Sequence, residues 1–410
     1  MKKIGNTGSF KNFYLNNQIY VDKTEYIYNL LNNEARVFIS RPRRFGKSLT
    51  LDTIGTLFEK GVDPFFKDTW IYDKWSETTY PVFRLSFLNL DNFSLDLFKK
   101  QLNSIISEFA NKISVKGYVE KTEPEDSILY LLEKLEEETR QIVILIDEYD
   151  YQLTSNINND DLYKEFQKKI KRFYANIKDK FAIKFLGITG VTRLKDVEIF
   201  SIGSDINDIT NDSAYSQMIG FTRDEIKKFY IDYLKLAASY ENNCTVDDVT
   251  EAQLESMLDM MAQNYDGYCF DEDYEKKVFS TWSVNIFFQS VYKKKIVQFG
   301  EYWYDNGGLP SILVNYLKTH KLNALDYVEK DKTITIKVND FKNPTTLTSI
   351  NQNVLMCQTG YLTLRSPVYS KGFMTLGIPN SEVYNALLSL MALNIFDDTK
   401  LEPTMISKKA

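Results

Sequence analysis

The stretch SRPRRFGKSLTLD, residues 40–52, contains a glycine, a lysine and a serine in the order that phosphate-binding loops use. In the loop pattern G-x-x-x-x-G-K-[ST], backbone N–H groups surround the phosphates, the lysine reaches the β and γ oxygens, and the hydroxyl binds Mg²⁺. Gly46, Lys47 and Ser48 match the end of this pattern, whereas Arg41 occupies the position of the first glycine. The candidate nucleotide-binding residues are Arg41, Pro42, Arg43, Arg44, Phe45, Gly46, Lys47, Ser48 and Leu49.

A second candidate group lies about a hundred residues downstream, in the stretch QIVILIDEYD (141–150). Its apolar run followed by acids is typical of a strand that is buried on both faces and ends at a polar edge. There Asp147 would hold Mg²⁺ through water, together with Ser48, and Glu148 would polarise the attacking water. The sequence does not show where the two acids point. An alternative to a nucleotide site is therefore that the loop is only a basic turn and that the acids only mark the end of an unrelated core strand.

These residues need a scaffold that brings two distant segments together. Short β-rich runs alternate along the first half of the chain with apolar residues at helical spacing, which predicts a parallel α/β sheet with right-handed crossovers. The predicted strands are 35–40, 80–87, 141–147 and 181–188, and the predicted helices are 47–60, 96–113, 125–138 and 161–180.

The pattern changes after about residue 215. Residues 222–240 and 250–265 are helical by spacing, and Thr222 and Glu225 form a capping-box match. Beyond about residue 290 the signals are mixed, with a strand at 332–338 and a hairpin over 360–380. We therefore expect three parts: a P-loop core (1–215), a helical lid region (216–290) and a mixed α/β region (291–410), which could form a winged-helix-like interaction module.

Composition excludes several classes of protein. The formal net charge of -6 argues against a surface that binds nucleic acid as a whole. The three cysteines lie far apart without a CxxC pair, so neither a disulfide framework nor a zinc ribbon is indicated. His320 is the single histidine, which argues against Ser-His or Cys-His catalysis. No signal peptide or membrane span is apparent, and we expect a cytoplasmic protein without a membrane partner.

Nine segments, in order along nearly the whole chain, resemble the bacterial AAA-ATPase-like family, in which an arginine in place of the first loop glycine is usual. The segments are YVDKTEYI (20–27), SRPRRFGKSLTLD (40–52), VILIDEYD (143–150), ITGVTRLKDVEIFSIGSDINDIT (188–210), GFTRDEI (220–226), YDGYCF (265–270), YWYDNGGLPSILV (302–314), QTGYLTL (358–364) and LGIPNSEV (376–383).

The resemblance implies roles for individual residues. Lys47 and Ser48 would bind phosphate and metal, Asp147 and Glu148 would bind metal and water, and Thr189 would sense the γ-phosphate. The resemblance also makes three arginines candidates for stabilising transition-state charge, although exposed arginines without a role are an equal alternative. These three are Arg43, Arg44 and Arg193.

Relatives of this kind often carry a C-terminal PD-(D/E)XK nuclease-like domain. About 27 residues follow the IPNSEV segment, and EKDK (329–332) is better interpreted as a charged turn. We therefore expect that domain to be absent.

The leading hypothesis is an Mg²⁺-dependent ATPase, with turnover that could be slow, in which ATP moves the lid and the C-terminal region. A nucleotide-gated switch or interaction protein that retains ATP or ADP is the alternative, and a DNA-processing or defence-associated subunit is a weaker one. The sequence leaves four points open. These are whether the chain binds a protein partner or a second copy of itself, whether it binds nucleic acid, whether it prefers ATP or GTP, and whether an arginine finger acts in cis or in trans.

Overall fold

The α/β core is built on a parallel sheet. The structure is a computed structural model and describes residues 1–194, 205–303, 311–317, 320, 326–343, 346–347, 349–369 and 372–395. Within these ranges the sheet has five strands in the order β4-β5-β6-β3-β7, and every neighbouring pair is parallel. The strands are β3 (Arg36–Ser40), β4 (Val82–Ser86), β5 (Ile142–Asp147), β6 (Ile183–Gly190) and β7 (Asn207–Asp208).

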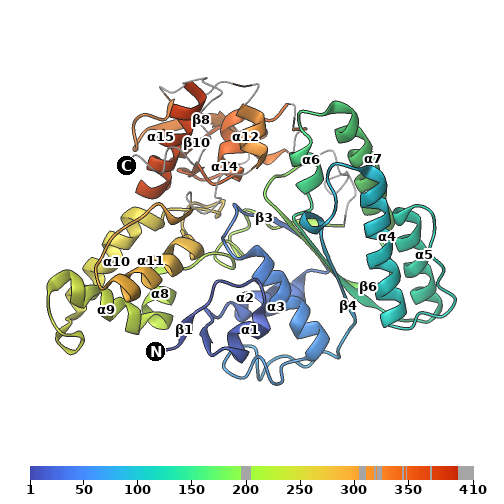
Figure 1. Ribbon diagram of the computed structural model, residues 1–410, viewed down its shortest axis with the longest axis horizontal. Helices are drawn as coiled ribbons and strands as arrows, with labels where there is room; N and C mark the ends of the chain where they lie inside the picture. The colour runs from blue at the N-terminus through green and yellow to red at the C-terminus, as the bar shows by residue number, and fades with distance from the viewer. Residues whose placement is uncertain are drawn as a thin grey trace.

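Helices cover both faces of this sheet (Figure 1). The interior strand β5 is buried from Ile142 to Ile146 and only Asp147 is partly exposed, as expected for a strand covered on both faces. One layer contains α4, α5 and α7, and α3 packs on the other face with α1 and α2 beside it. The bounds are α1 (Phe10–Leu15), α2 (Thr24–Asn33), α3 (Lys47–Lys60), α4 (Leu95–Lys112), α5 (Pro124–Glu137), α6 (Tyr151–Ser155) and α7 (Asp160–Ile177).

The helical region that follows has an apolar cluster of its own, which also takes in Ile19 and Val21 from the N-terminal segment. The single helix expected over 222–240 is two helices, because the chain leaves helical geometry at Tyr230. The ring of Tyr230 is buried and stacks on Phe288, so tertiary packing decides this break. The helices are α8 (Arg223–Phe229), α9 (Ile231–Asn242), α10 (Glu251–Tyr265) and α11 (Thr281–Lys294).

The C-terminal region lies above the sheet in Figure 1, and its apolar side chains belong to the same cluster as the α/β core. Its strands form an antiparallel sheet in the order β8-β10-β9, and the predicted hairpin corresponds to β9 and β10. The elements are α12 (Ser311–Leu317), β8 (Thr333–Lys337), α13 (Val338–Lys342), α14 (Gln352–Gln358), β9 (Thr363–Leu364), β10 (Phe373–Gly377) and α15 (Ser381–Ile395).

The predicted fold class is confirmed: a parallel sheet flanked by helices is followed by a helical region and a mixed α/β region. The short strands β1 (Lys3–Ile4), β2 (Gln18–Ile19) and β7 were not expected, because two residues are too few to show a period. Parts of the quoted segments 188–210 and 302–314, and the residues after 395, lie outside the described residues. Within the described ranges, no helix combines the length and apolar character needed to cross a membrane.

Candidate nucleotide site

The loop between β3 and α3 places its glycine where an L-residue would be strained. Gly46 is the N-cap of α3 with φ +108°, and Arg44 also has a positive φ, +68°. The Nζ atom of Lys47 turns back and donates to the backbone oxygens of Arg41 at 3.0 Å and Pro42 at 3.1 Å. The loop and the first turn of α3 therefore leave backbone N–H groups at a helix N-terminus, which is a favourable setting for an anion.

The structure brings the loop and the two acids to the same edge of the sheet. Strand β6 lies between β3 and β5, and all three run in the same direction. The Ser48 Oγ donates to Asp147 Oδ2 at 2.5 Å, and the Thr189 Oγ1 donates to Asp147 Oδ1 at 2.5 Å. Side chains from α3, β5 and β6 thus meet at one carboxylate.

Glu148 follows in a left-handed backbone conformation with φ +52°. Burial raises the pKa of its carboxyl group, as do Asp150 and Asp147 nearby, whereas Lys47 and Arg43 lower it. A carboxyl group whose pKa is raised in this way is closer to the working pH of a general base than an exposed glutamate.

Tyr149 and Asp150 hold the backbone around Glu148. The buried Asp150 carboxylate accepts from Thr192 N at 2.8 Å and from Thr192 Oγ1 at 2.5 Å. The Tyr149 hydroxyl donates to Thr192 O and accepts from Leu194 N. These bonds connect the end of β5 to the end of β6, so they determine the direction in which Glu148 leaves the sheet.

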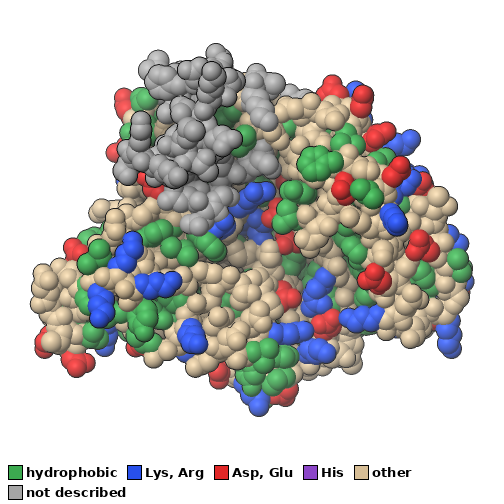
Figure 2. Space-filling view, in the orientation of Figure 1, with side chains coloured by type: hydrophobic (Ala, Val, Ile, Leu, Met, Phe, Trp, Pro, Cys, Tyr) green, Lys and Arg blue, Asp and Glu red, His purple; other side chains and the backbone are tan. Residues whose placement is uncertain are grey.

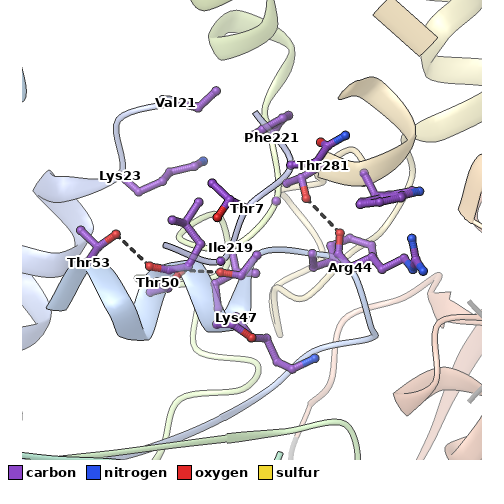
Figure 3. A pocket seen from close by; sticks show the side chains of 18 of the residues that line it. Thr7, Val21, Lys23, Arg44, Lys47, Thr50, Thr53, Ile219, Phe221 and Thr281 are labelled. Carbon is purple, nitrogen blue, oxygen red and sulfur yellow. Dashed lines mark hydrogen bonds between the residues drawn. The ribbon is translucent and has the colours of Figure 1, made fainter. Parts of the chain in front are cut away.

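A cavity of about 400 Å³ opens beside the loop (Figure 3). It lies between the N-terminal segment, α3 and the helical region. Among the described residues that line it, four are cations and one is a carboxylate, namely Lys23, Arg43, Arg44, Lys47 and Glu148. Lys and Arg side chains also border the hollow near the middle of the face in Figure 2. The excess of positive charge suits a phosphorylated ligand.

The helical region contacts the loop directly. The Thr281 Oγ1 donates to Arg44 O at 2.9 Å, and the Arg44 guanidinium lies 4.1 Å from the ring centroid of Trp282. Burial lowers the pKa of Arg44, and neighbouring Arg43 acts in the same direction. On the other side of the cavity, Lys23 Nζ donates to Gln217 O at 2.8 Å and pairs with a carboxylate of α8.

The structure directs some candidate side chains away from this cavity. The buried Arg41 guanidinium donates to Ser40 O and Thr210 O. The Phe45 ring is buried and packs edge-on against Tyr268, although the residue also lines the cavity. The motif predicts that positions 41 and 45 belong to a phosphate loop, and in the structure their side chains anchor that loop to the protein core.

Arg193 is also absent from the lining of the main cavity. Its guanidinium pairs with Asp208 at 2.6 Å and donates to Phe341 O and Lys342 O in α13. It therefore connects the end of β6 to the C-terminal region. Leu49 lines the main cavity, whereas Pro42 packs against Gly360, where an added Cβ would lie 2.9 Å from the Pro42 Cβ.

Sequence reasoning missed the far side of the cavity. The segments around 20–27 and 220–226 were singled out by resemblance without a role for Lys23 or Phe221, and residues 281–285 were not singled out at all. The additional lining residues come from four separate segments, so no local spacing marks them. They include Gly5, Thr7, Gly8, Val21, Lys23, Met218, Ile219, Phe221, Thr281, Trp282 and Asn285.

The donors at this edge fit a magnesium ion. Mg²⁺ is a hard cation that prefers oxygen ligands, a few from the protein and the rest from water and phosphate. Ser48 supplies a hydroxyl oxygen and Asp147 a carboxylate oxygen, and the two lie within hydrogen-bond distance of each other.

Comparison with known proteins agrees with the sequence resemblance. Residues 4–200 match the model of a family described as Predicted AAA-ATPase. A curated protein from Azotobacter chroococcum mcd 1, "Uncharacterized protein in vnfD 5'region", is 27% identical over 351 residues, which make up 84% of this chain and 60% of that protein. The chain thus spans about three fifths of the length of that relative.

Two solved structures are similar at a low level. Cdc6p from Pyrobaculum aerophilum has a TM-score of 0.29 and 12% identity, with 98% of this chain and 100% of that chain covered. The Aeropyrum pernix Orc1 protein in complex with DNA has a TM-score of 0.29 and 11% identity, with 91% and 94% covered. The match to the Predicted AAA-ATPase family over residues 4–200 supports nucleotide binding and hydrolysis in general.

Proposed function

We propose that the chain binds ATP in the 400 Å³ cavity, hydrolyses it with Mg²⁺, and transmits the nucleotide state to the helical region. The observation that carries the proposal is that the loop backbone, Lys47, Ser48 and Glu148 all line this one cavity. The loop would bind the triphosphate through its backbone N–H groups, and Lys47 would leave the carbonyls of residues 41 and 42 to bind the β and γ oxygens.

The chain's own residues would then supply orientation and electrostatics. Mg²⁺, held by Ser48 and Asp147, would neutralise charge on the β and γ phosphates. Glu148 would accept a hydrogen bond from the attacking water and align it. Thr189, which donates a hydrogen bond to the same Asp147 carboxylate as Ser48, would sense whether a γ-phosphate is present.

Arg44 would pass the change on to the helical region. Its backbone oxygen and its guanidinium contact Thr281 and Trp282 of α11, so a loop that closes on phosphate also pulls on α11. These two contacts must break if the cavity is to open toward α11. This arrangement favours slow nucleotide exchange, and therefore supports the second candidate function, a switch that retains ATP or ADP.

Substitution of Lys47 tests the binding site. We expect Lys47→Ala to weaken ATP binding by about 10- to 100-fold, because a charged hydrogen bond to phosphate contributes about 1.5–3 kcal/mol. Calorimetric titration with ATP and Mg²⁺ measures the effect. Lys60→Ala, at the exposed end of the same helix, is the matched control and should bind like the unaltered chain. Equal affinity in the Lys47 variant would contradict the proposal.

Substitution of Glu148 separates enzyme from switch. Glu148→Gln should retain ATP affinity while the rate of phosphate release falls by about 10²–10⁴-fold, the usual contribution of a general base. Glu165→Gln, an exposed position on α7, is the control. If the unaltered chain copurifies with nucleotide and shows negligible turnover, it acts as a nucleotide-retaining switch and not as an enzyme. If Glu148→Gln hydrolyses ATP at the normal rate, Glu148 has no role in hydrolysis.

A further inference from the structure

A second, smaller cavity of about 30 Å³ lies on the opposite side of the loop from the nucleotide site. It is lined by the ends of β3 and β6, the segment after β7, the segment after α10, and α13, α14 and β9. The lining includes Arg41, Arg193, Asn211, Cys269, Cys357 and Gln358. A volume of this size holds one water molecule or one small ion.

Arg41 brings unpaired donors to this cavity. Its side chain is 1% exposed, and only Nη1 has hydrogen-bond partners, the oxygens of Ser40 and Thr210. The Nε and Nη2 atoms are buried without a partner. The guanidinium lies 4.2 Å from the ring centroid of Phe270, which covers one face but cannot accept from in-plane N–H groups. Buried donors without an acceptor destabilise the folded chain, because they lose hydrogen bonds to water and gain none in return.

The charge around this cavity is unbalanced. Burial lowers the pKa of Arg41 to about 9, so the group is still charged at pH 7. Arg193 also lines the cavity, and its charge is met by Asp208. Among the described residues, none that lines the cavity is acidic. Two arginines and one carboxylate leave a net positive charge in a buried place.

The two thiols do not supply the missing charge. Burial raises the pKa of Cys269 to about 11 and that of Cys357 to about 12, so both are neutral at pH 7. A neutral thiol is a weak donor, and the Cys269 thiol donates to Asp271 O. The side-chain amides of Asn211 and Gln358 carry ordinary N–H donors, which can face a small anion.

We propose that this cavity is a halide site, in which one chloride ion accepts from Nε and Nη2 of Arg41 and neutralises the buried guanidinium. The surrounding groups carry one uncompensated positive charge, so a monovalent halide matches the site, whereas divalent sulfate does not. The ion strengthens the attachment of the phosphate loop to α14 and to the segment after α10. This proposal is independent of the nucleotide site, because Arg41 points away from it.

The test is thermal unfolding without nucleotide in sodium chloride, bromide, gluconate and sulfate at constant ionic strength. We expect chloride and bromide to raise the melting temperature saturably by about 2 °C relative to gluconate, because ligand binding to the folded state alone stabilises it by mass action. Sulfate should give no saturable halide-like effect. Crystals grown with bromide should show an anomalous peak beside Nε of Arg41.

Variants identify the site. Arg41→Met should lose the halide dependence, whereas Arg365→Met should keep it, because Arg365 is a half-buried arginine of the same region that donates to Ile378 O outside this cavity. The bromide map on the unaltered chain decides the question if Arg41→Met does not fold. A map with only a water molecule at Arg41, or equal melting temperatures in chloride and gluconate, would overturn the proposal.

Discussion

Glu382, in the first turn of α15, is a buried carboxyl group that joins three parts of the chain. Its side-chain oxygens accept from Trp303 N at 2.8 Å and from Ser283 Oγ at 2.8 Å. The Trp303 indole in turn donates to Arg43 O in the loop. Burial raises the pKa of Glu382 from 4.5 to about 8, so the group is protonated in the folded chain at pH 7.

This shift predicts a pH dependence of stability. Between pH 4.5 and about 8 the folded chain retains a proton that the unfolded chain has lost, so the free energy of unfolding falls as pH rises through this window. The loss is on the order of 4 kcal/mol. Glu382→Gln should remove this part of the slope in urea unfolding measured across the window, while Glu329→Gln, an exposed control, should keep it. Parallel curves for all three chains would contradict the assignment.

Among the elements, α11 covers the cavity from the side opposite the sheet. Trp282 at its first turn lies over the guanidinium of Arg44, and this cation–π contact contributes about 0.5–2 kcal/mol. We expect Trp282→Ala to weaken ATP binding by about fivefold and to speed nucleotide dissociation by a similar factor, because α11 then holds the loop less firmly. Stopped-flow displacement of a fluorescent ATP analogue measures both quantities.

A matched control exists elsewhere on the surface. Trp70 makes a similar contact with Lys74, at 4.5 Å, away from the cavity. Trp70→Ala should leave nucleotide dissociation unchanged. If both tryptophan variants release nucleotide at the same rate, α11 does not hold the site closed.

At the scale of the whole molecule, the C-terminal region is packed onto the loop. Gly360 has φ +93°, and an added Cβ would lie 2.9 Å from the Pro42 Cβ and 3.3 Å from Trp303. The shared apolar cluster continues from the sheet into this region. Displacement of the C-terminal region would therefore change the support behind residues 41–44, so this region can influence the proposed nucleotide site.

Gly360→Ala should destabilise the chain through this contact. Gly372→Ala is the control, because it has a similar φ of +99° but no atom within 4 Å of an added Cβ. Both variants incur the left-handed backbone cost of about 1–2 kcal/mol. Gly360→Ala should lose about 1–3 kcal/mol more through overpacking. Equilibrium unfolding in urea measures the free energy of unfolding of both variants. Equal losses would show that the chain accommodates the added Cβ at position 360 without destabilisation.

Local patterns predicted much of the core. The apolar run before Asp147 and the helical spacing after Lys47 placed the loop and the acids at strand ends, and parallel strands bring such ends to one edge. The break at Tyr230 was not predictable, because it depends on a ring 58 residues later in the chain, Phe288. The short strand β7 was missed for lack of length.

By itself, the sequence determined the loop of residues 41–48, the two acids and the strands that present them, because these features are encoded in contiguous residues whose polarity follows the period of their own element. Only the tertiary structure decided that Arg41 turns into the core and that Arg193 pairs with Asp208. It also decided that Trp282 and Lys23 close the cavity. Each of these outcomes depends on packing and charge contacts between segments far apart in the chain, and a linear pattern contains no record of such contacts.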